Sequence, residues 1–471
     1  MRLTLVLVVI TAACAGSGSV PTSTTPEPTG TLIGSQSFDS GYPPAPEVPS
    51  GDLDPAVEAE LNGLLAGALA GSFENEAIDQ IVAAGDARVA WALADLMRFI
   101  QVGEPAAQLQ RGFSQLTRAS LAGSTGPVFT EAFDHLIAWD LPDWAGYAQF
   151  KRDLYTVVEP GWDPFFEEDV AIDWRLVTWG GVLIDDRPLG SPDPCPDGCI
   201  PALDDPLTTP VSGGDWYPDD GIVFGLDVSG ASLALPKNQM QVHEMVNLTL
   251  GGMRLGIPYC TLCGSAQAYV TGSVPDDFEP SVLRTSGLLS RSNKMMYDLL
   301  TGSVFDTFTG EALSGPLARI GFTFDQVSVV SSTWGQWKQE HPDTQIIAED
   351  GGIGRTYAED PLRGRDDDGP IFPTGPIDPR LPAMELVVGV LDADGIPIAF
   401  PVESTRLALQ AGTTVHINGL SASLSGDGVL VTGPGGETSG EIGSHEAFWF
   451  AWSQFYPKTL VWERYPLVRD P

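Results

Sequence analysis

Two cysteines separated by two residues, Cys260 and Cys263, and a nearby histidine, His243, are the residues of this chain best suited to chemistry. Both residue types are scarce, with five cysteines and five histidines in 471 residues. A thiolate pair beside an imidazole could ligate a soft metal, and the thiols alone could cycle between dithiol and disulfide. The chemistry depends on whether the three side chains meet in space.

Three interpretations of this constellation stay open from the sequence. Cys260 and Cys263 could form a structural disulfide with His243 half-buried nearby, bind a metal together with His243, or act as a redox pair. Two sulfurs and one nitrogen would leave an open coordination position, which suits copper or catalytic zinc. Copper and zinc are therefore the expected cofactors if the site holds one.

Three neighbouring residues are expected to support this site. Glu244 follows the histidine directly and could orient its imidazole through a hydrogen bond. Asn247 and Tyr259 flank the histidine and the first cysteine in the sequence, so we expect them just behind the ligands.

The amino terminus is typical of a bacterial lipoprotein signal. Met1-Arg2 supplies positive charge, Leu3 to Ile10 is an apolar run too short to span a bilayer, and small residues precede Cys14. Residues 1–14 are predicted to be a signal peptide up to a lipidated Cys14. An ordinary secretory signal is the alternative. Either way the protein is expected outside the cytoplasm, at the outer face of the cytoplasmic membrane or secreted, and in contact with the membrane only through a lipid.

Four cysteines remain once Cys14 is set aside, and an even number in an oxidising compartment favours disulfides. Cys195 and Cys199 lie in Pro-rich surroundings. We expect them to close a surface loop through their own bridge.

The charge of the chain excludes one class of partner. Its 62 acidic and 24 basic residues give a formal net charge of −38, which repels nucleic-acid phosphates. Hydrophobic residues make up 43% of the chain, enough for globular cores in two or three domains.

The composition changes along the chain and predicts an α+β protein. After the signal, residues 15–53 are Ser/Thr/Pro-rich and indicate a flexible tether. Residues 54–173 have helical periodicity, with Pro55 opening one helix and Gly85-Asp86 separating two others. This pattern resembles a unit of a HEAT-like repeat, and this helical domain could contact a protein partner.

The rest of the chain is predicted to be a duplicated, predominantly β domain with short helices. Residues 174–384 form the first module and residues 385–471 the second, shorter one. Residues 223–236 match residues 387–401, and residues 334–344 match residues 449–459. The second copy lacks equivalents of His243, Cys260 and Cys263, which favours a site placed on one copy over a requirement of the common fold.

Residues 179–462 resemble a bacterial extracytoplasmic family known as domain of unknown function 3179. The resemblance lies in His243-Glu244-Met245-Val246-Asn247, Gly251-Gly252 and Tyr259-Cys260-Thr261-Leu262-Cys263-Gly264, and in the downstream elements Ser286-Gly287-Leu288-Leu289 and Met296-Tyr297-Asp298. Leu248 and Phe305 depart from the pattern. The resemblance implies a shared fold and an extracytoplasmic location, and it implies no activity.

Three functions are compatible with these observations, so whether the protein is an enzyme stays open. The first is a metal-binding or thiol-redox protein that uses His243, Cys260 and Cys263. The second is a binding or scaffolding lipoprotein whose cysteines are structural disulfides. The third, a hydrolase using Asp298 or Glu244, has only generic support. The sequence names no ligand.

Overall fold

The computed structural model describes residues 30–35, 37–73, 75–121, 126–166, 171–191, 195, 198–365, 369–433 and 442–464. The predicted signal peptide and Cys14 lie outside these ranges. Helices and many strands in several sheets give an α+β fold, as predicted. Within the described ranges, no helix is long and apolar enough to cross a membrane.

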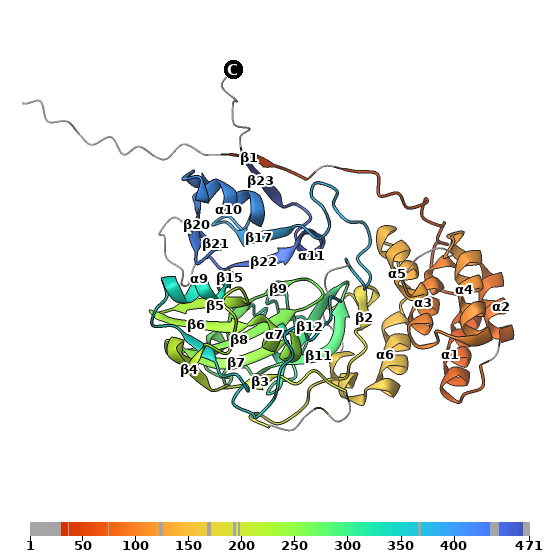
Figure 1. Ribbon diagram of the computed structural model, residues 1–471. Coiled ribbons are helices and arrows are strands. Elements are labelled where there is room, and N and C mark those ends of the chain that lie inside the picture. The colour runs from red at the N-terminus through yellow and green to blue at the C-terminus, as the bar shows by residue number, and fades with distance from the viewer. Residues whose placement is uncertain are drawn as a thin grey trace, which may run out of the picture.

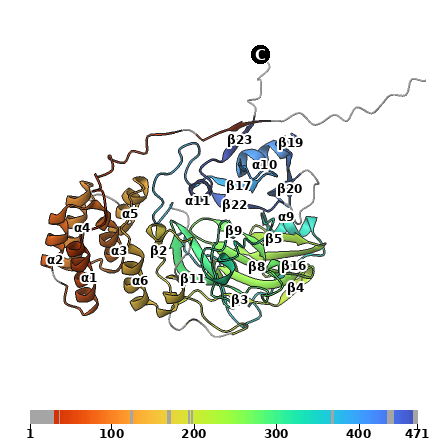
Figure 2. The same ribbon diagram turned by 180° about the vertical axis from the view of Figure 1, so that it is seen from behind.

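Helices α1 to α6 pack together on one side of the molecule (Figures 1 and 2). They are α1 (Pro55–Leu69), α2 (Asn75–Ala84), α3 (Ala90–Phe99), α4 (Gly103–Thr117), α5 (Val128–Ala138) and α6 (Tyr147–Val158). The carboxylate of Asp54 accepts a hydrogen bond from the Ala56 N–H at 2.8 Å and caps α1, and Pro55 occupies its first turn. Gly85 and Asp86 separate α2 from α3, as the sequence predicts.

Helix α3 forms the centre of this group, since it is buried from Ala90 to Arg98. Its Asp95 forms an ion pair with Lys151 of α6 at 3.0 Å, and neither side chain is exposed. The hydroxyl groups of Tyr147 and Tyr155 also donate to Asp95, at 2.7 and 3.0 Å. A fully hydrogen-bonded pair avoids the cost of an unpaired buried charge, so this network holds α3 against α6.

The first β-rich region contains three sheets, in the orders β14-β10-β8-β7-β3, β13-β12-β11-β2 and β15-β5-β6-β16-β4. Its strands are β2 (Val177–Trp179), β3 (Leu203–Asp204), β4 (Thr208–Pro210), β5 (Ile222–Val228), β6 (Ala231–Pro236), β7 (Met245–Leu250), β8 (Met253–Cys260), β9 (Ser265–Ala266), β10 (Ala268–Val270), β11 (Leu283–Ser290), β12 (Asn293–Asp298), β13 (Val304–Asp306), β14 (Gln326–Val327), β15 (Val330–Thr333) and β16 (Gln345–Ile347). Its helices are α7 (Lys237–His243), α8 (Gly315–Ala318) and α9 (Trp334–Glu340).

The carboxyl-terminal region adds a sheet in the order β1-β23-β18-β17-β22 and a small sheet, β19-β20-β21. Its strands are β17 (Leu386–Leu391), β18 (Pro397–Pro401), β19 (Val415–Ile417), β20 (Leu420–Ser425), β21 (Gly428–Thr432), β22 (Ser444–Phe448) and β23 (Leu460–Arg464), and its helices are α10 (Val402–Gln410) and α11 (Trp449–Phe455). Figure 1 shows this region stacked above the first β-rich region.

Two of these sheets share strand order and direction. Strands β15, β5 and β6 are antiparallel neighbours and β6 runs parallel to β16; strands β22, β17 and β18 are antiparallel and β18 runs parallel to β23. The ring of Trp337 packs on Gly225 in one sheet, and the ring of Trp452 packs on Gly389 in the other. Glycine leaves the space that each indole occupies.

The described part of the predicted tether, residues 30–53 without residue 36, contacts both the carboxyl-terminal sheet and the helices. Strand β1 (Gly30–Ile33) pairs with β23, and the chain then crosses to the helices (Figure 1). Trp139 donates to the carbonyl oxygen of Pro43 at 2.6 Å, and Arg88 donates to that of Gly51 at 2.7 Å. Backbone pairing of this kind does not depend on apolar composition, which is why the Pro-rich composition was misleading here.

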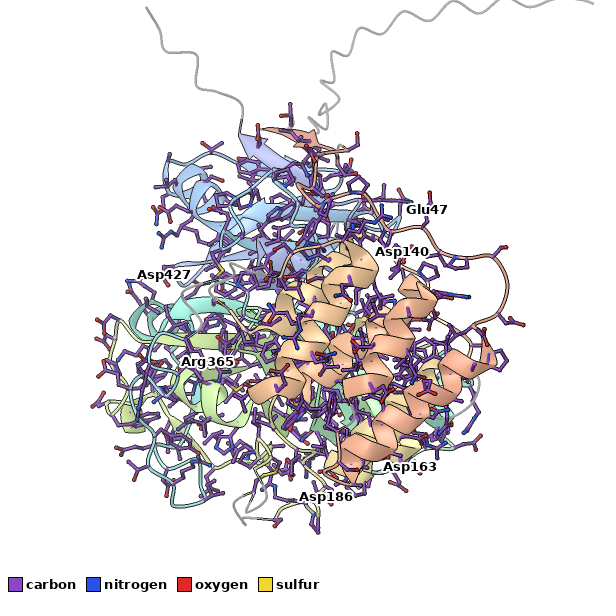
Figure 3. The ribbon with its side chains drawn as sticks, turned by 90° about the vertical axis from the view of Figure 1, so that its right-hand side faces the viewer. Glu47, Asp140, Asp163, Asp186, Arg365 and Asp427 are labelled. Atoms are coloured by element: carbon purple, nitrogen blue, oxygen red, sulfur yellow. A yellow bond between two sulfur atoms is a disulfide. The ribbon has the colours of Figure 1, made fainter. Side chains whose placement is uncertain are left out.

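The helices share their core with one β-sheet. Leu288, Met295, Tyr297 and Val304, from β11 to β13, belong to the same apolar cluster as the helical residues. The predicted boundary at residue 173 therefore lies inside continuous packing. The acidic side chains labelled in Figure 3 are spread across this view and do not gather in one place.

Candidate functional site

The site is built around the end of α7. Glu244 follows His243 and adopts the left-handed conformation (φ 50°), which ends the helix and directs the chain into β7. Strands β7 and β8 form a hairpin, so Cys260 at the end of β8 returns to the level of α7. The main-chain N–H of Tyr259 donates to the Glu244 carbonyl oxygen at 3.0 Å and fixes this approach.

Cys260 and Cys263 are free thiols, and both are buried. The Cys263 thiol donates a hydrogen bond to the Cys260 sulfur, and the main-chain N–H of Lys294 donates to the same sulfur. Cys263 also contacts the carbonyl oxygen of Ser292 at 3.4 Å. The dithiol therefore lies between the turn after β8 and the start of β12.

A buried lysine and a glutamate adjoin the dithiol. The Lys294 ammonium donates to the Glu244 carbonyl oxygen, and it lies 3.6 Å from the Glu244 carboxylate. The hydroxyl of Thr261, between the two cysteines, donates to the same carboxylate at 2.9 Å. Burial lowers the pKa of Lys294, while the charges of Glu244 and Cys260 act in the opposite direction. We call Glu244, Cys260, Thr261, Cys263 and Lys294 the dithiol cluster.

The surroundings make the two thiols unequal. Burial acts to raise the pKa of Cys260, but the hydrogen bonds from Cys263 and from the Lys294 N–H outweigh it, so the pKa falls below that of an ordinary thiol. Burial and the adjacent Cys260 raise the pKa of Cys263 well above the usual value. Cys260 is therefore the thiol that ionises first, and Cys263 keeps its proton.

The imidazole of His243 is engaged elsewhere. Its Nδ1 lies 2.7 Å from the Pro201 carbonyl oxygen, which only accepts, so Nδ1 carries the proton. Burial, with a smaller contribution from the positive charges of Arg355 and Arg187, lowers the pKa of His243 to about 4, so the ring is neutral at pH 7. Its Nε2 therefore accepts a hydrogen bond from the Tyr357 hydroxyl, at 2.7 Å.

The structure does not bring His243 together with Cys260 and Cys263. In the part of the chain that the structure describes, these residues do not form a group of three whose ligand atoms lie within 4.8 Å of one another. Both ring nitrogens already have partners, and neither partner is a thiol. The residues are close along the chain. At the end of α7, however, the imidazole contacts Pro201 and Tyr357, whereas the Glu244 backbone contacts Lys294 of the dithiol cluster.

The three supporting residues have other roles than predicted. Glu244 contacts Lys294 and Thr261 instead of orienting the imidazole. Asn247 joins three strands: its side chain donates to Asp204 and to the Leu283 carbonyl, and accepts from the Leu283 N–H, each at 3.0 Å. Tyr259 is buried, with its ring 4.8 Å from that of Phe224.

Cys195 and Cys199 form a disulfide, as predicted. Together with Asp185 they are the one group of three metal-ligand residue types found close together among the described residues. Their sulfurs are bonded to each other, and Asp185 binds Arg187 at 2.6 Å. In this group of described residues, both sulfurs are therefore part of the disulfide, and neither is a thiolate that could bind a metal.

Sequence reasoning missed Lys294 and Tyr357. Lys294 lies just before the family-like element Met296-Tyr297-Asp298, but nothing in a lone lysine indicates burial. Tyr357 lies in a segment without regular secondary structure, 114 residues from its partner His243. No local pattern could connect the two.

Comparison with known proteins adds a family to this geometry. Residues 197–427 match the family model described as protein of unknown function (DUF3179). This range contains α7, the dithiol cluster and Tyr357. No curated protein and no solved structure matches the chain.

Proposed function

For a chain that belongs to the DUF3179 family, we propose a thiol-redox function in which Cys260 and Cys263 cycle between dithiol and disulfide. The observation that carries the proposal is the hydrogen bond from the Cys263 thiol to the Cys260 sulfur beside the Lys294 ammonium. His243 is outside this chemistry.

The contacts of the two thiols support distinct roles. Cys260 is the nucleophile because its thiolate receives two hydrogen bonds and lies near a positive charge. It attacks a disulfide of the oxidant and releases one thiolate. Cys263 then loses its proton, attacks the Cys260 sulfur of the mixed disulfide and displaces the second thiolate. Both sulfurs are buried, so exchange requires local opening of the turn Thr261–Gly264.

A copper site is the second candidate. Two adjacent thiolates suit copper(I), a soft ion that thiolate ligands select. Zinc fits poorly, because it needs at least three protein ligands and no third Asp, Glu, His or Cys joins both sulfurs within 4.8 Å among the described residues. If copper were bound, Cys260 and Cys263 would hold it, and its metal content would be lost in a Cys260→Ser/Cys263→Ser variant.

The redox proposal is tested by the reduction potential of the pair. The protein is equilibrated in glutathione buffers of graded ratio, and alkylated peptides are counted by mass spectrometry. Stabilising the Cys260 thiolate stabilises the reduced form, so Cys260–Cys263 should become oxidised only at a higher potential than a structural disulfide, whose potential lies below roughly −300 mV.

The second cysteine pair provides an internal control. Cys195–Cys199 should stay oxidised through most of the series, and replacing both of these residues by serine should leave the Cys260–Cys263 midpoint unchanged. A Cys260–Cys263 bridge that resists reduction as strongly as a structural disulfide would contradict the proposal. That outcome favours the non-enzymatic binding or scaffolding protein.

We also propose that the protein is an extracytoplasmic lipoprotein. Two observations support this: the sequence from Met1 to Cys14, and the disulfide between Cys195 and Cys199, a type of bond that persists in oxidising compartments. The lipid at Cys14 would be the sole membrane contact, and the helical domain is available for a protein partner. Replacing Cys14 with serine should release the protein from the membrane fraction.

We infer in addition that the two similar sheets arose by duplication. Their common strand order and the Trp–Gly packing support this, as does a matching hydrogen bond: Trp337 donates to Thr344 at 3.1 Å and Trp452 donates to Thr459 at 2.8 Å. The successive helices α1 to α4 agree with a HEAT-like origin for the helical domain.

A further inference from the structure

A segment without regular secondary structure is held against α7 by three side chains of that helix. Gln239 donates to the carbonyl oxygen of Ala348 at 2.9 Å, and Asn238 donates to that of Ala358 at 3.1 Å. Between these points, His243 accepts from the Tyr357 hydroxyl at 2.7 Å. The helix thereby fixes residues 348–358 as a wall, and His243 sets the position of the Tyr357 ring.

This wall borders a cavity of about 1000 Å³. Trp216, Tyr217 and Asp220 also line the cavity, and α7 contributes Asn238 and Gln241. Such a volume lies at the upper end of the usual range for small-molecule sites. Three aromatic side chains and several polar groups therefore line one space that α7 organises.

Two polar side-chain atoms of residues that line the cavity are closed off from solvent and lack a hydrogen-bond partner among the described residues. One is a donor, the indole N–H of Trp216, and the other is an acceptor, Oδ1 of Asn238. Asn238 itself is only 8% exposed. Buried polar atoms normally have partners, so such atoms beside a cavity indicate where a ligand would bond after a small side-chain rotation.

The lining excludes simple ligand classes. Carboxylates (Asp220, Glu349) and cations (Lys237, Arg355) occur together, so no single charge sign selects an ion. Carboxylates outnumber cations in the lining, but in a proportion similar to that of the whole chain, so acidity does not distinguish this cavity from the rest of the protein. Polar groups are too numerous for a lipid chain.

We propose that this cavity binds a neutral oligosaccharide. Sugar hydroxyls both donate and accept, and so satisfy carboxylates, amides and the unpartnered Trp216 and Asn238 atoms together. The apolar faces of sugar rings pack on Trp216 and Tyr357, two half-exposed aromatic side chains of the lining. The proposal does not depend on the thiols.

His243 is a positioning residue in this proposal. It does not need to touch the sugar. Its hydrogen bond holds Tyr357 in the orientation that binding requires, so the entropy of the Tyr357 side chain is already lost in the free protein and is not lost again on binding. The family-like histidine thus acquires a role that the dithiol does not give it.

The test is calorimetric titration of the full folded chain with cellotetraose, maltotetraose, chitotetraose and spermine. At least one of the three oligosaccharides should bind, and Trp216→Ala should weaken that binding about tenfold, a loss of about 1.4 kcal/mol, because it removes an aromatic contact with the sugar. Phe38→Ala, an exposed aromatic outside the cavity, is the matched control and should leave the affinity unchanged.

The positioning role is tested at His243. His243→Leu should weaken sugar binding severalfold, whereas His243→Gln, which retains one donor and one acceptor, should restore most of the affinity. Cys260→Ser/Cys263→Ser should bind sugar normally, so the outcome is separable from the redox proposal. Melting temperatures identify variants that fail to fold. If the His243 variants fail to fold, Trp216→Ala still tests the proposal, because Trp216 is only half-buried. Absence of binding to all three sugars, or binding of spermine alone, would overturn the proposal.

Discussion

Buried charged groups determine the chemistry available to single residues here. The Lys294 ammonium is buried, and its charge is compensated by the Glu244 carboxylate and by nearby carbonyl oxygens. A thiolate at Cys260 adds a second negative partner. The ionisation of the thiol and the stability of the fold are consequently linked.

Replacing Lys294 by methionine should raise the pKa of the Cys260 thiol, because the positive charge is removed while the main-chain hydrogen bond remains. The pH dependence of thiolate absorbance in the ultraviolet measures this. The single variant should also lose about 3 kcal/mol of unfolding free energy, since Glu244 is left unpaired.

The double variant Glu244→Gln/Lys294→Met is the control for that loss. It removes both charges and should recover part of the stability while retaining the raised pKa. A pKa of Cys260 that is equal in wild type and both variants would show that the ammonium has no influence on the thiol.

Glu446 provides a pH-dependent prediction at the same scale. It lies in β22, buried, beside a cavity of about 460 Å³ between the two similar sheets, and burial raises its pKa to about 7. Above pH 7 the folded state carries a buried carboxylate. Between pH 7 and the unfolded pKa of 4.5, the folded state binds this proton and the unfolded state does not, so the folded state becomes more stable as the pH falls.

Glu446→Gln should therefore be more stable than wild type at pH 8, by about 1–3 kcal/mol, and the difference should shrink towards zero as the pH falls to about 4.5. Urea unfolding at several pH values measures the gap. A gap that does not change with pH would mean that Glu446 has the same pKa in the folded and unfolded states.

Among the elements, the paired positions Gly225 and Gly389 have the clearest physical requirement. Each lies on a strand at the point where an indole, Trp337 or Trp452, covers the backbone. A methyl group at either position would overlap with the ring. The sheets can shift only slightly because each indole also donates to a buried threonine.

Gly225→Ala and Gly389→Ala should each lower the free energy of unfolding by about 1–3 kcal/mol through overpacking. Gly63→Ala in α1 is the matched control, because an added methyl meets nothing within 4 Å there, and it should stabilise by about 0.5–1 kcal/mol. Equal effects at all three positions, measured by denaturant unfolding, would contradict the packing explanation.

For the whole molecule, the amino-terminal segment connects distant parts. Strand β1 covers the edge of β23, and Arg380 donates to the carbonyl oxygens of Ile33 and Thr459, at 3.0 and 2.6 Å. The same segment then reaches the helices through Pro43 and Gly51. It bridges the carboxyl-terminal sheet and the helical domain (Figure 1).

A variant that begins at residue 37 should therefore have a lower melting temperature and a tendency to dimerise through the exposed edge of β23. A variant that begins at residue 30 keeps β1 and is the control. Sedimentation velocity and thermal unfolding compare the two. Identical behaviour would mean that β1 contributes nothing to the edge.

The sequence by itself determined the local features of this protein. Features that depend on neighbouring residues or on a linear motif could be predicted. They are the helix start at Pro55, the break at Gly85-Asp86, the Gly251-Gly252 hairpin, the Cys195–Cys199 bridge and the family. The α+β class followed from the change in periodicity along the chain.

The tertiary structure alone decided which residues share a site. One left-handed residue, Glu244, separates the His243 ring from the thiols, and no spacing rule encodes that turn. Lys294, Tyr357 and strand β1 find their partners 34 or more residues away, where only packing of the whole chain brings them together. Local sequence sets the conformation of a segment, whereas burial and long-range pairing determine its neighbours.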